Sequence, residues 1–232
     1  SQIDYYLGDK VVIPKEYKKY FSEKIIYVPY SYMCFDDQQK VRTKYFRRKD
    51  FKLPEEAFVL AAFHNNIKIT LKEIDSWSNI LTNISNAVIW ISSTNKIAES
   101  NIRKYFRERG IEKERILFAP RMKTREEHLS RHSCADLFID TFNWNANSTA
   151  IDSLWEGLPI VTKLGKSFEA RATASFLTTL NLTELIAHSL EEYEDIIIEL
   201  SRNHAKLEEI KNKLQKSKYN SNLFNSQKFT DN

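Results

Sequence analysis

From position 58 onward, short apolar runs alternate with longer segments in which apolar residues recur at helical spacing. The short runs are rich in β-branched and aromatic residues, which favour strands, and they lie at 58–63, 87–91, 116–118, 137–139 and 159–162. Strands that alternate with helices along the chain form βαβ units, in which the strands run parallel. The pattern therefore predicts an α/β fold with a parallel sheet of about five strands.

Capping signals mark where two of the helices start. Thr70 is followed three positions later by Glu73, and Thr124 by Glu127, which is the spacing of a capping box. Gly110 follows a helical segment at 97–106 and is interpreted as its C-cap. Further helices are predicted at 148–156 and 168–180. One long amphipathic helix is predicted after them, with an apolar stripe formed by Tyr193, Ile197, Leu200, Leu207, Ile210 and Leu214.

The first 50 residues differ in character from the rest. Strands are predicted at 11–13 and 25–28, but two short strands and one short helix cannot bury a core by themselves. The polar and charged stretch at 36–50 is interpreted as a linker. We therefore expect residues 1–48 to be the remnant of a preceding domain with its linker, residues 49–218 to form the main domain, and residues 219–232 to be a truncated tail.

The composition is that of a folded protein. Of the 232 residues, 42% are hydrophobic and 28% are charged, and the net charge is +4. The densest basic stretch, 44–49, holds four cations with two aromatic residues between them, and we interpret it as a solvated linker and not as a nucleic-acid site. No apolar run reaches the roughly 18 residues that a membrane span needs. Neither nucleic acid nor a membrane is therefore an expected partner.

The two cysteines indicate a reducing compartment. Cys34 and Cys134 are far apart in the sequence and form no Cys-x-x-Cys motif, so that neither a disulfide nor a structural zinc site is indicated. Residues 1–10 lack the charged and apolar blocks of a signal peptide, although a chain that is incomplete at its N-terminus could have lost one. We expect a cytoplasmic location.

The motifs that the chain lacks exclude several classes of site. Its four glycines, Gly8, Gly110, Gly157 and Gly165, are spaced too widely for either Gly-x-Gly-x-x-Gly or a P-loop. The sequence also has no Asp-x-Asp motif and no His/Cys cluster at the spacing of metal ligands. Neither a bound cofactor nor a catalytic metal is therefore expected.

The segment 140–152 is the most informative part of the chain. It leaves the carboxyl end of a predicted strand, where open α/β sheets bind ligands, and it enters a helix at about Ser148. A helix N-terminus suits phosphate, and Ser148 and Thr149 add hydroxyl donors. Asp152, on the same helix face, could hold ribose hydroxyls or brace the loop. The alternative is that Asn147 or Ser148 simply caps the helix.

Cations follow two other strands. Lys68 comes just after the first strand of the main domain, where an ammonium group could stabilise a departing diphosphate. Arg121, His128 and Arg131 follow the third strand, and His128 and Arg131 lie near one helix face because they are three positions apart. His128 could contact a base edge and Arg131 a phosphate. For each residue the alternative is ordinary, a solvated lysine or a structural histidine, but independent surface residues have no reason to converge on one sheet edge.

Three stretches at these places also carry a resemblance to a known family. They are Phe63-His-Asn-Asn-Ile-Lys-Ile69, Phe118-Ala-Pro-Arg121 and an Asp-x-Leu-Trp-x-Gly-x-Pro motif at 152–159. They resemble the catalytic region of the O-linked N-acetylglucosamine transferase family, including its bacterial and SPINDLY-like members. The resemblance extends to 4–9, 22–29, 167–175 and 223–225, and so covers nearly the whole chain.

The resemblance implies a GT-B glycosyltransferase, in which two Rossmann-like domains face each other across a cleft. Residues 49–218 would be the second domain, which holds the nucleotide sugar, and residues 1–48 a remnant of the N-terminal catalytic domain. Lys68 would lie on the diphosphate as the catalytic residue. By the same resemblance, the substrate-binding residues are Asn65, Lys68, Arg121, His128, Arg131, Asn147, Ser148, Thr149 and Asp152.

Two departures from the family pattern matter. The family usually has His-Thr-Thr where this chain has Asn147-Ser148-Thr149, which leaves nucleotide affinity and donor choice open. Most of the first domain, with its histidine, would lie upstream of Ser1, and the family's helical repeats are missing from this sequence. Whether this chain alone turns over is therefore open as well.

The expected function is transfer of N-acetylglucosamine from its UDP ester to Ser or Thr hydroxyls of a protein, without a metal. A related asparagine glucosyltransferase, or an enzyme that uses a GDP-sugar, is the nearest alternative. A binding module is the competing class: a non-catalytic nucleotide-sugar domain that serves as a scaffold or sensor.

Overall fold

The computed structural model describes residues 2–35 and 44–231, and its main feature is a parallel sheet of six strands. Every strand pair in this sheet is parallel, which confirms the predicted α/β class, and the order is β5-β4-β3-β6-β7-β8. The predicted number of about five was one too few, because β8 has only two residues and leaves no apolar run to recognise. The strands are β3 (Phe58–Ala62), β4 (Ala87–Ser92), β5 (Ile116–Ala119), β6 (Leu137–Ile139), β7 (Ile160–Lys163) and β8 (Ile186–Ala187).

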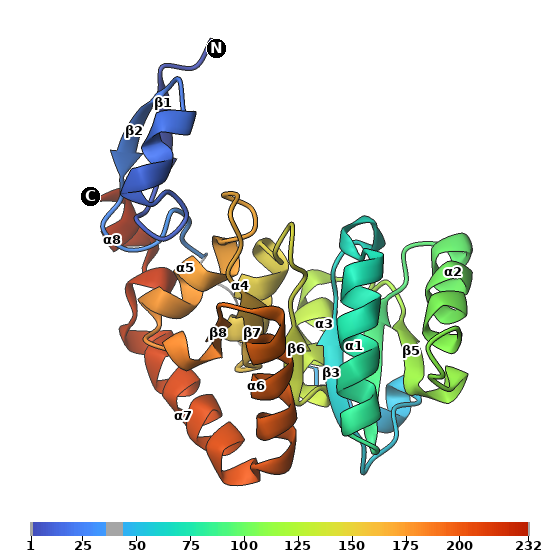
Figure 1. Ribbon diagram of the computed structural model, residues 1–232. Coiled ribbons are helices and arrows are strands. Elements are labelled where there is room, and N and C mark those ends of the chain that lie inside the picture. Colours follow the sequence, from blue (N-terminus) through green and yellow to red (C-terminus); the bar gives the residue numbers. More distant parts are fainter. Residues whose placement is uncertain (1, 36–43, 232) are drawn as a thin grey trace.

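Helices cover both faces of the sheet (Figure 1). On one face α1 (Leu71–Asn83) contacts α2 (Lys96–Arg107) and α6 (Leu190–Arg202), while α3 (Arg125–Ser130) and α4 (Ser148–Trp155) lie on the other. The central strands are buried on both sides, as parallel strands in such layers are. The remaining helices are α5 (Ala172–Thr179), α7 (His204–Asn220), α8 (Ser226–Thr230) and the 3₁₀ turns η1 (Lys15–Tyr20), η2 (Arg48–Phe51), η3 (Asn66–Lys68), η4 (Lys113–Arg115), η5 (Arg131–Cys134), η6 (Thr183–Leu185) and η7 (Asn222–Phe224).

The predicted capping signals form local contacts in the structure. Thr70 and Glu73 make the reciprocal bonds of a capping box at the start of α1. At α3 only half of the predicted capping box forms: the side chain of Thr124 accepts from the N–H of Glu127, but the Glu127 carboxylate accepts from the N–H of Lys123 and not from that of Thr124. Gly110, at φ 76°, lies in the left-handed region just after α2, as expected of a C-cap glycine.

Two predictions in the C-terminal half were wrong. The long amphipathic helix is two helices, because Asn203 leaves helical geometry at φ −111° and ψ 80° and its side chain caps α7. The apolar stripe continues across this break, through buried Leu200 and Leu207, so that periodicity alone could not reveal it. The helix predicted from 168 begins only at Ala172, since Arg171 has a non-helical ψ of −4° at φ −127°.

The N-terminal segment also differs from the prediction. Residues 11–13 form a turn, because one carboxylate oxygen of Asp9 accepts from the N–H groups of Val11 and Val12. The strand is instead β1 (Tyr5–Gly8), which pairs in parallel with β2 (Lys24–Tyr27) in a separate two-stranded sheet that lies beyond α5 in Figure 1. Residues 36–43 of the predicted linker lie outside the described residues.

The segment 2–35 is fastened to the main domain by polar and aromatic contacts. The other oxygen of Asp9 accepts from the N–H of Tyr32 and from the hydroxyl of Ser175 on α5. Phe35 packs against Trp155 at 5.0 Å between ring centroids. The predicted limits of the three regions, 1–48, 49–218 and 219–232, stay predictions. Over the described residues, no helix is both long enough and apolar enough to cross a bilayer.

Candidate functional site

The sheet order makes a topological switch point at the carboxyl ends of β3 and β6, and we use the word crevice for this place between the two strand ends. The chain winds outward from β3 through β4 and β5, then returns to the other side of β3 to begin β6, so that the helices after β3 and β6 leave on opposite faces. In doubly wound sheets, ligands bind outside the carboxyl ends of the strands at such a switch point. Lys68 lies just past β3 and the loop 140–147 just past β6, so both line this crevice.

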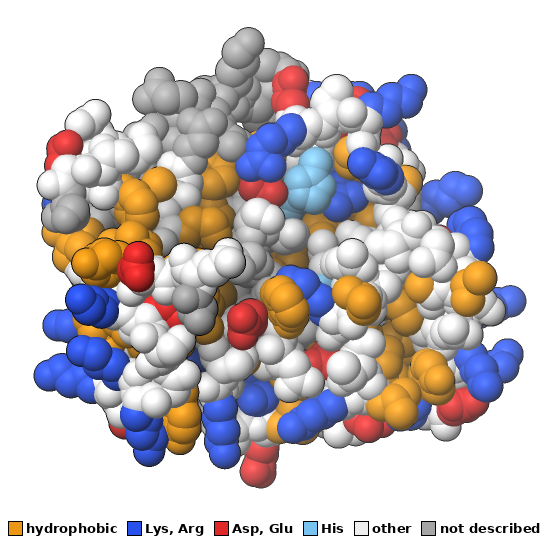
Figure 2. All heavy atoms as spheres, turned by 90° about the horizontal axis from the view of Figure 1, so that it is seen from above, with side chains coloured by type: hydrophobic (Ala, Val, Ile, Leu, Met, Phe, Trp, Pro, Cys, Tyr) orange, Lys and Arg blue, Asp and Glu red, His pale blue; other side chains and the backbone are white. Residues whose placement is uncertain are grey.

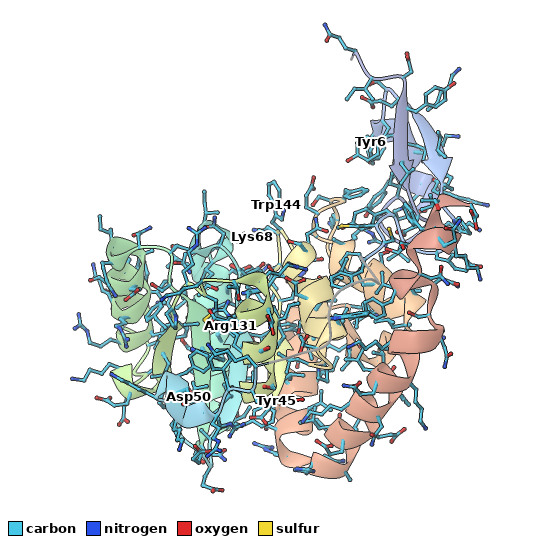
Figure 3. All side chains as sticks on the ribbon, turned by 180° about the vertical axis from the view of Figure 1, so that it is seen from behind. Tyr6, Tyr45, Asp50, Lys68, Arg131 and Trp144 are labelled. Atoms are coloured by element: carbon cyan, nitrogen blue, oxygen red, sulfur yellow. The ribbon has the colours of Figure 1, made fainter. Side chains whose placement is uncertain are left out.

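Lys68 spans the crevice. Its Nζ donates to the carbonyl oxygen of Asn145 at 2.9 Å and lies 5.6 Å from the ring centroid of Trp144. Partial burial lowers the pKa of Lys68, and the charge of Asp140 acts in the opposite direction. Figure 3 shows Lys68 and Trp144 together at the upper edge of the sheet, the edge of the carboxyl ends.

The start of α4 lacks a side-chain cap. Asn147 precedes the helix, but its side chain makes no cap hydrogen bond and instead accepts a short bond from the hydroxyl of Tyr32. The alternative interpretation, that Asn147 or Ser148 simply caps the helix, is therefore wrong for the Asn147 side chain. Ser148 is exposed and Thr149 half-buried, and the first N–H groups of a helix have no acceptor within it. Side chains cap α1, α2, α3, α6 and α7, whereas α5, like α4, has no side-chain cap.

The loop that leads into α4 is held by a buried carboxylate. One oxygen of Asp140 accepts from the N–H groups of Thr141 at 2.9 Å and Ala146 at 2.7 Å, and the other accepts from the hydroxyl of Thr162 at 2.7 Å. Burial raises the pKa of Asp140 to about 6, although these hydrogen bonds act to lower it. The loop is therefore fixed from below, and the direction of the α4 N-terminus with it.

A cleft of about 540 Å³ opens beside the crevice, past the ends of β3, β4 and β5. Asn65 and Arg121 are exposed at its rim. Viewed from above, Figure 2 shows a histidine on this face among basic side chains and beside an acidic one. The cleft is lined by Phe63, His64, Asn65, Ser92, Ser93, Thr94, Ala119, Pro120, Arg121, Met122, Lys123, Thr124, Arg125, His128 and Arg131.

A charged cluster connects this cleft to α4. Arg125 donates to Asp152 at 2.6 Å, and Nε2 of His128 lies 3.5 Å from the other oxygen of Asp152. Burial alone would raise the pKa of Asp152, but the contacts with His128 and Arg125 hold it below its ordinary value. Asp152 lies one helical turn after Ser148, so α4 contributes its first turn to the crevice and its second to the cleft.

Arg131 lies deeper than a surface phosphate ligand. Its side chain is buried at 3% exposure, its guanidinium stacks on Phe63 at 4.1 Å, and it donates to the carbonyl of Pro120 at 2.9 Å. Burial lowers its pKa to about 10, so it stays a cation. Figure 3 shows Arg131 well below Lys68, inside the fold. Arg131 therefore supports the wall of the cleft.

The structure gathers the predicted residues into two neighbouring groups. Lys68 and the residues Asn147 to Thr149 lie past the ends of the adjacent strands β3 and β6, Asn65, Arg121, His128 and Arg131 line the cleft, and Asp152 contacts His128 from behind it. Within the described residues, no three His, Cys, Asp or Glu side chains come together as a metal site would require.

Sequence reasoning missed three residues at this edge. Arg125 stands three positions before His128 and so shares its helix face, a signal that was present but not used. Trp144 lies within the segment singled out, but its exposure cannot be read from the sequence. Tyr32 comes from a segment 115 positions away from Asn147, and no local pattern indicates that contact.

This edge of the fold can be compared with known proteins. A family model, glycosyl transferase family 41, matches residues 37–232. The chain belongs to glycosyl transferase family 41. The resemblance seen in the sequence is thereby confirmed, and the fold is that of the GT-B glycosyltransferases.

Similar proteins are found among plants, animals and bacteria. The chain is 30% identical over 238 residues to the probable UDP-N-acetylglucosamine–peptide N-acetylglucosaminyltransferase SEC of Arabidopsis thaliana. The match covers 100% of this chain and 24% of that protein. It is 32% identical over 182 residues to a UDP-N-acetylglucosamine–peptide N-acetylglucosaminyltransferase of Caenorhabditis elegans, covering 78% of this chain and 16% of that one. The chain thus spans a quarter or less of the length of these two relatives.

Two solved structures share the fold. A mutant O-GlcNAc transferase of Thermobaculum terrenum matches 98% of this chain and 42% of its own, with a TM-score of 0.86 and 23% identity. A mutant of TarM from S. aureus, solved with UDP among its ligands, matches 97% of this chain and 44% of its own, with a TM-score of 0.62 and 12% identity.

Proposed function

We propose that this chain binds the donor of a protein glycosyltransferase, UDP-N-acetylglucosamine, for transfer of the sugar to Ser or Thr hydroxyls. The observation that carries the proposal is that Lys68 donates to Asn145, in the loop that leads into the uncapped start of α4, at the switch point of the sheet. The names of the relatives in Arabidopsis thaliana and Caenorhabditis elegans, which specify this donor and a peptide acceptor, support it.

The diphosphate binds between Lys68 and the start of α4. Both offer positive charge: an ammonium group on one side, and on the other the N–H groups and the positive end of the helix dipole. The hydroxyls of Ser148 and Thr149 add donors at the same place. Lys68 and the helix supply the charge that a metal would otherwise supply to the leaving group.

The nucleoside extends into the cleft. A volume of about 540 Å³ lies in the usual range for small-molecule pockets. In this proposal His128 contacts the base, and Asp152, which Arg125 and His128 hold, contacts the ribose hydroxyls. Arg121 and Asn65 close the rim, while Arg131 holds the wall behind them.

The reaction is a displacement at the anomeric carbon. The acceptor hydroxyl oxygen forms the new bond to this carbon as its bond to the β-phosphate oxygen breaks. The bonding electrons go to the departing UDP, and Lys68 and the α4 N-terminus stabilise the negative charge that it gains. The proton of the acceptor hydroxyl goes to a base or to water. Groups placed where charge develops lower the barrier most.

UDP binding tests the proposal. UDP at about 100 times its dissociation constant should raise the Tm of the 232-residue chain by roughly 5–10 °C. Lys68→Ala should remove more than half of that shift, because the ammonium group would contact the diphosphate directly. Lys72→Ala is the matched control, an exposed lysine on α1, and it should keep the full shift. An unchanged shift in Lys68→Ala, or no shift in the unaltered chain, would refute the assignment.

A further inference from the structure

Trp144 is exposed where the other tryptophans are buried. Trp77 and Trp90 have no exposed surface and Trp155 is 9% exposed, whereas Trp144 is 54% exposed. An indole buries a large apolar area when it finds a partner, so a fixed and exposed one is an unused binding surface.

The loop holds Trp144 from both sides. The carbonyl oxygen of Trp144 accepts from the hydroxyl of Thr141 at 2.7 Å. The backbone N–H of the next residue, Asn145, donates to the backbone carbonyl of Glu169 at 2.9 Å, and its side-chain amide donates to the backbone carbonyl of Thr141 at 2.7 Å. The backbone under the ring is therefore set before any ligand arrives, which lowers the entropy lost when a ligand binds there.

The ring lies beside the proposed diphosphate site. Nζ of Lys68 is 5.6 Å from the ring centroid, and Figure 3 shows both side chains at the same edge of the sheet. In a nucleotide sugar a single oxygen joins the β-phosphate to the anomeric carbon. A sugar whose diphosphate rests on Lys68 must therefore lie within a few ångströms of Lys68, and the exposed indole of Trp144 is an aromatic surface at that distance.

We infer that Trp144 is the platform on which the pyranose ring of the donor packs, and that it sets donor specificity. The inference rests on the proposed function. Pyranose rings with equatorial substituents present a flat face of C–H groups, and the negative face of an aromatic ring attracts them. The base and diphosphate contacts lie elsewhere, at His128, Lys68 and α4, so the contribution of Trp144 falls on the sugar alone.

Binding of UDP and UDP-N-acetylglucosamine, measured by calorimetry on the full chain, separates the two parts of the donor. Trp144→Ala should weaken UDP-N-acetylglucosamine about tenfold while leaving UDP within about twofold, and Trp144→Phe should keep most of the sugar affinity. Tyr20→Ala, which removes an aromatic group that is 72% exposed and far from the crevice, is the control and should change neither. Equal weakening of both ligands would show that Trp144 only positions Lys68, and would overturn the platform.

Iodide quenching of tryptophan fluorescence gives a second readout, because Trp144 is the exposed one of the four tryptophans. UDP-N-acetylglucosamine should protect a fraction of the fluorescence that UDP leaves open to iodide, and Trp144→Phe should abolish the difference. Equal protection by both ligands would overturn the inference while leaving the proposed function intact. Failure of the unaltered chain to bind either ligand would overturn both.

Discussion

The helices α1 and α4 follow β3 and β6, which are neighbours in the sheet, but the starts of the two helices are capped in different ways. At α1, Thr70 accepts from the N–H of Lys72 at 3.2 Å, and Glu73 accepts from the N–H of Thr70 at 2.8 Å, so the helix closes its own end. At α4, Asn147 is in the capping position, but its side chain accepts from the hydroxyl of Tyr32 and does not cap the helix. Both helices carry the same dipole, but only the second leaves it available to a ligand.

The two helix starts also use buried carboxylates differently. Glu73, fully buried, caps α1 and with its other oxygen accepts from the N–H of Phe142 at 2.9 Å, so it also braces the loop before α4. Asp140 accepts only from groups outside the helix that its loop introduces. An open helix start is thus made by tertiary contacts and is not a property of the helix sequence.

The largest expected effect comes from Asp140→Asn. Burial raises the pKa of Asp140 from 3.8 to about 6, so the folded chain keeps a proton that the unfolded chain has lost between these values. Unfolding then releases a proton, and the stabilisation from this group, fully present below the unfolded pKa, is lost as pH rises through about 6. The loss is on the order of 3 kcal/mol.

Urea unfolding from about pH 4 to pH 7 measures it. The free energy of unfolding of the unaltered chain, minus that of Asp140→Asn, should fall between about pH 4 and 6 and then level off. A difference that stays constant with pH would show that this carboxylate does not hold the loop in buried form.

Thr70→Ala tests the closed end of the comparison. Loss of this cap should lower the free energy of unfolding by about 1 kcal/mol, because the N–H of Lys72 loses its side-chain acceptor. UDP affinity should stay within about twofold, since α1 closes its own end and offers nothing to the ligand. A tenfold loss of UDP affinity, measured by calorimetry, would show that UDP binds at the start of α1 and not at the start of α4.

Tyr32→Phe tests the open end and has the smallest expected effect. Burial raises the pKa of the Tyr32 hydroxyl well above its usual range, so it remains a donor to Asn147 at all ordinary pH values. Without it, the Asn147 side chain can turn to cap α4 and compete with phosphate, which should weaken UDP about threefold.

A double variant supplies the control for this prediction. Adding Asn147→Ala to Tyr32→Phe removes the competing cap and should restore UDP affinity. If the double variant binds UDP more weakly than Tyr32→Phe alone, then Asn147 is a ligand of the nucleotide and not its competitor.

The sequence sufficed where short-range patterns decide structure. The capping box of Thr70 and Glu73, the C-cap at Gly110 and the parallel sheet all follow from spacing within a few residues or from alternation of elements. Lys68 could be placed beside the loop that leads into α4 for a related reason, since every parallel strand delivers its carboxyl end to one edge. The break at Asn203 had a signal, a good N-cap residue, which a continuous apolar stripe concealed.

Long-range contacts decided the rest. The depth of Arg131 depends on its stacking on Phe63, and the state of the α4 start depends on Tyr32, and both of these partners are distant in the sequence. Side-chain partners across the fold, and not propensity, determine these two features. The turn at 11–13 is local by contrast, because Asp9 accepts from the N–H groups two and three positions after it, a signal that the apolar run at 11–13 concealed.

Amide chemical shifts measured during a UDP titration test directly whether the diphosphate binds at the start of α4. In ¹H–¹⁵N spectra of the full chain, we predict that the N–H signals of Ser148 and Thr149 move most on binding, while those of Leu71 to Glu73 stay nearly in place. If the α1 signals move and those at the start of α4 do not, the diphosphate does not bind at the start of α4.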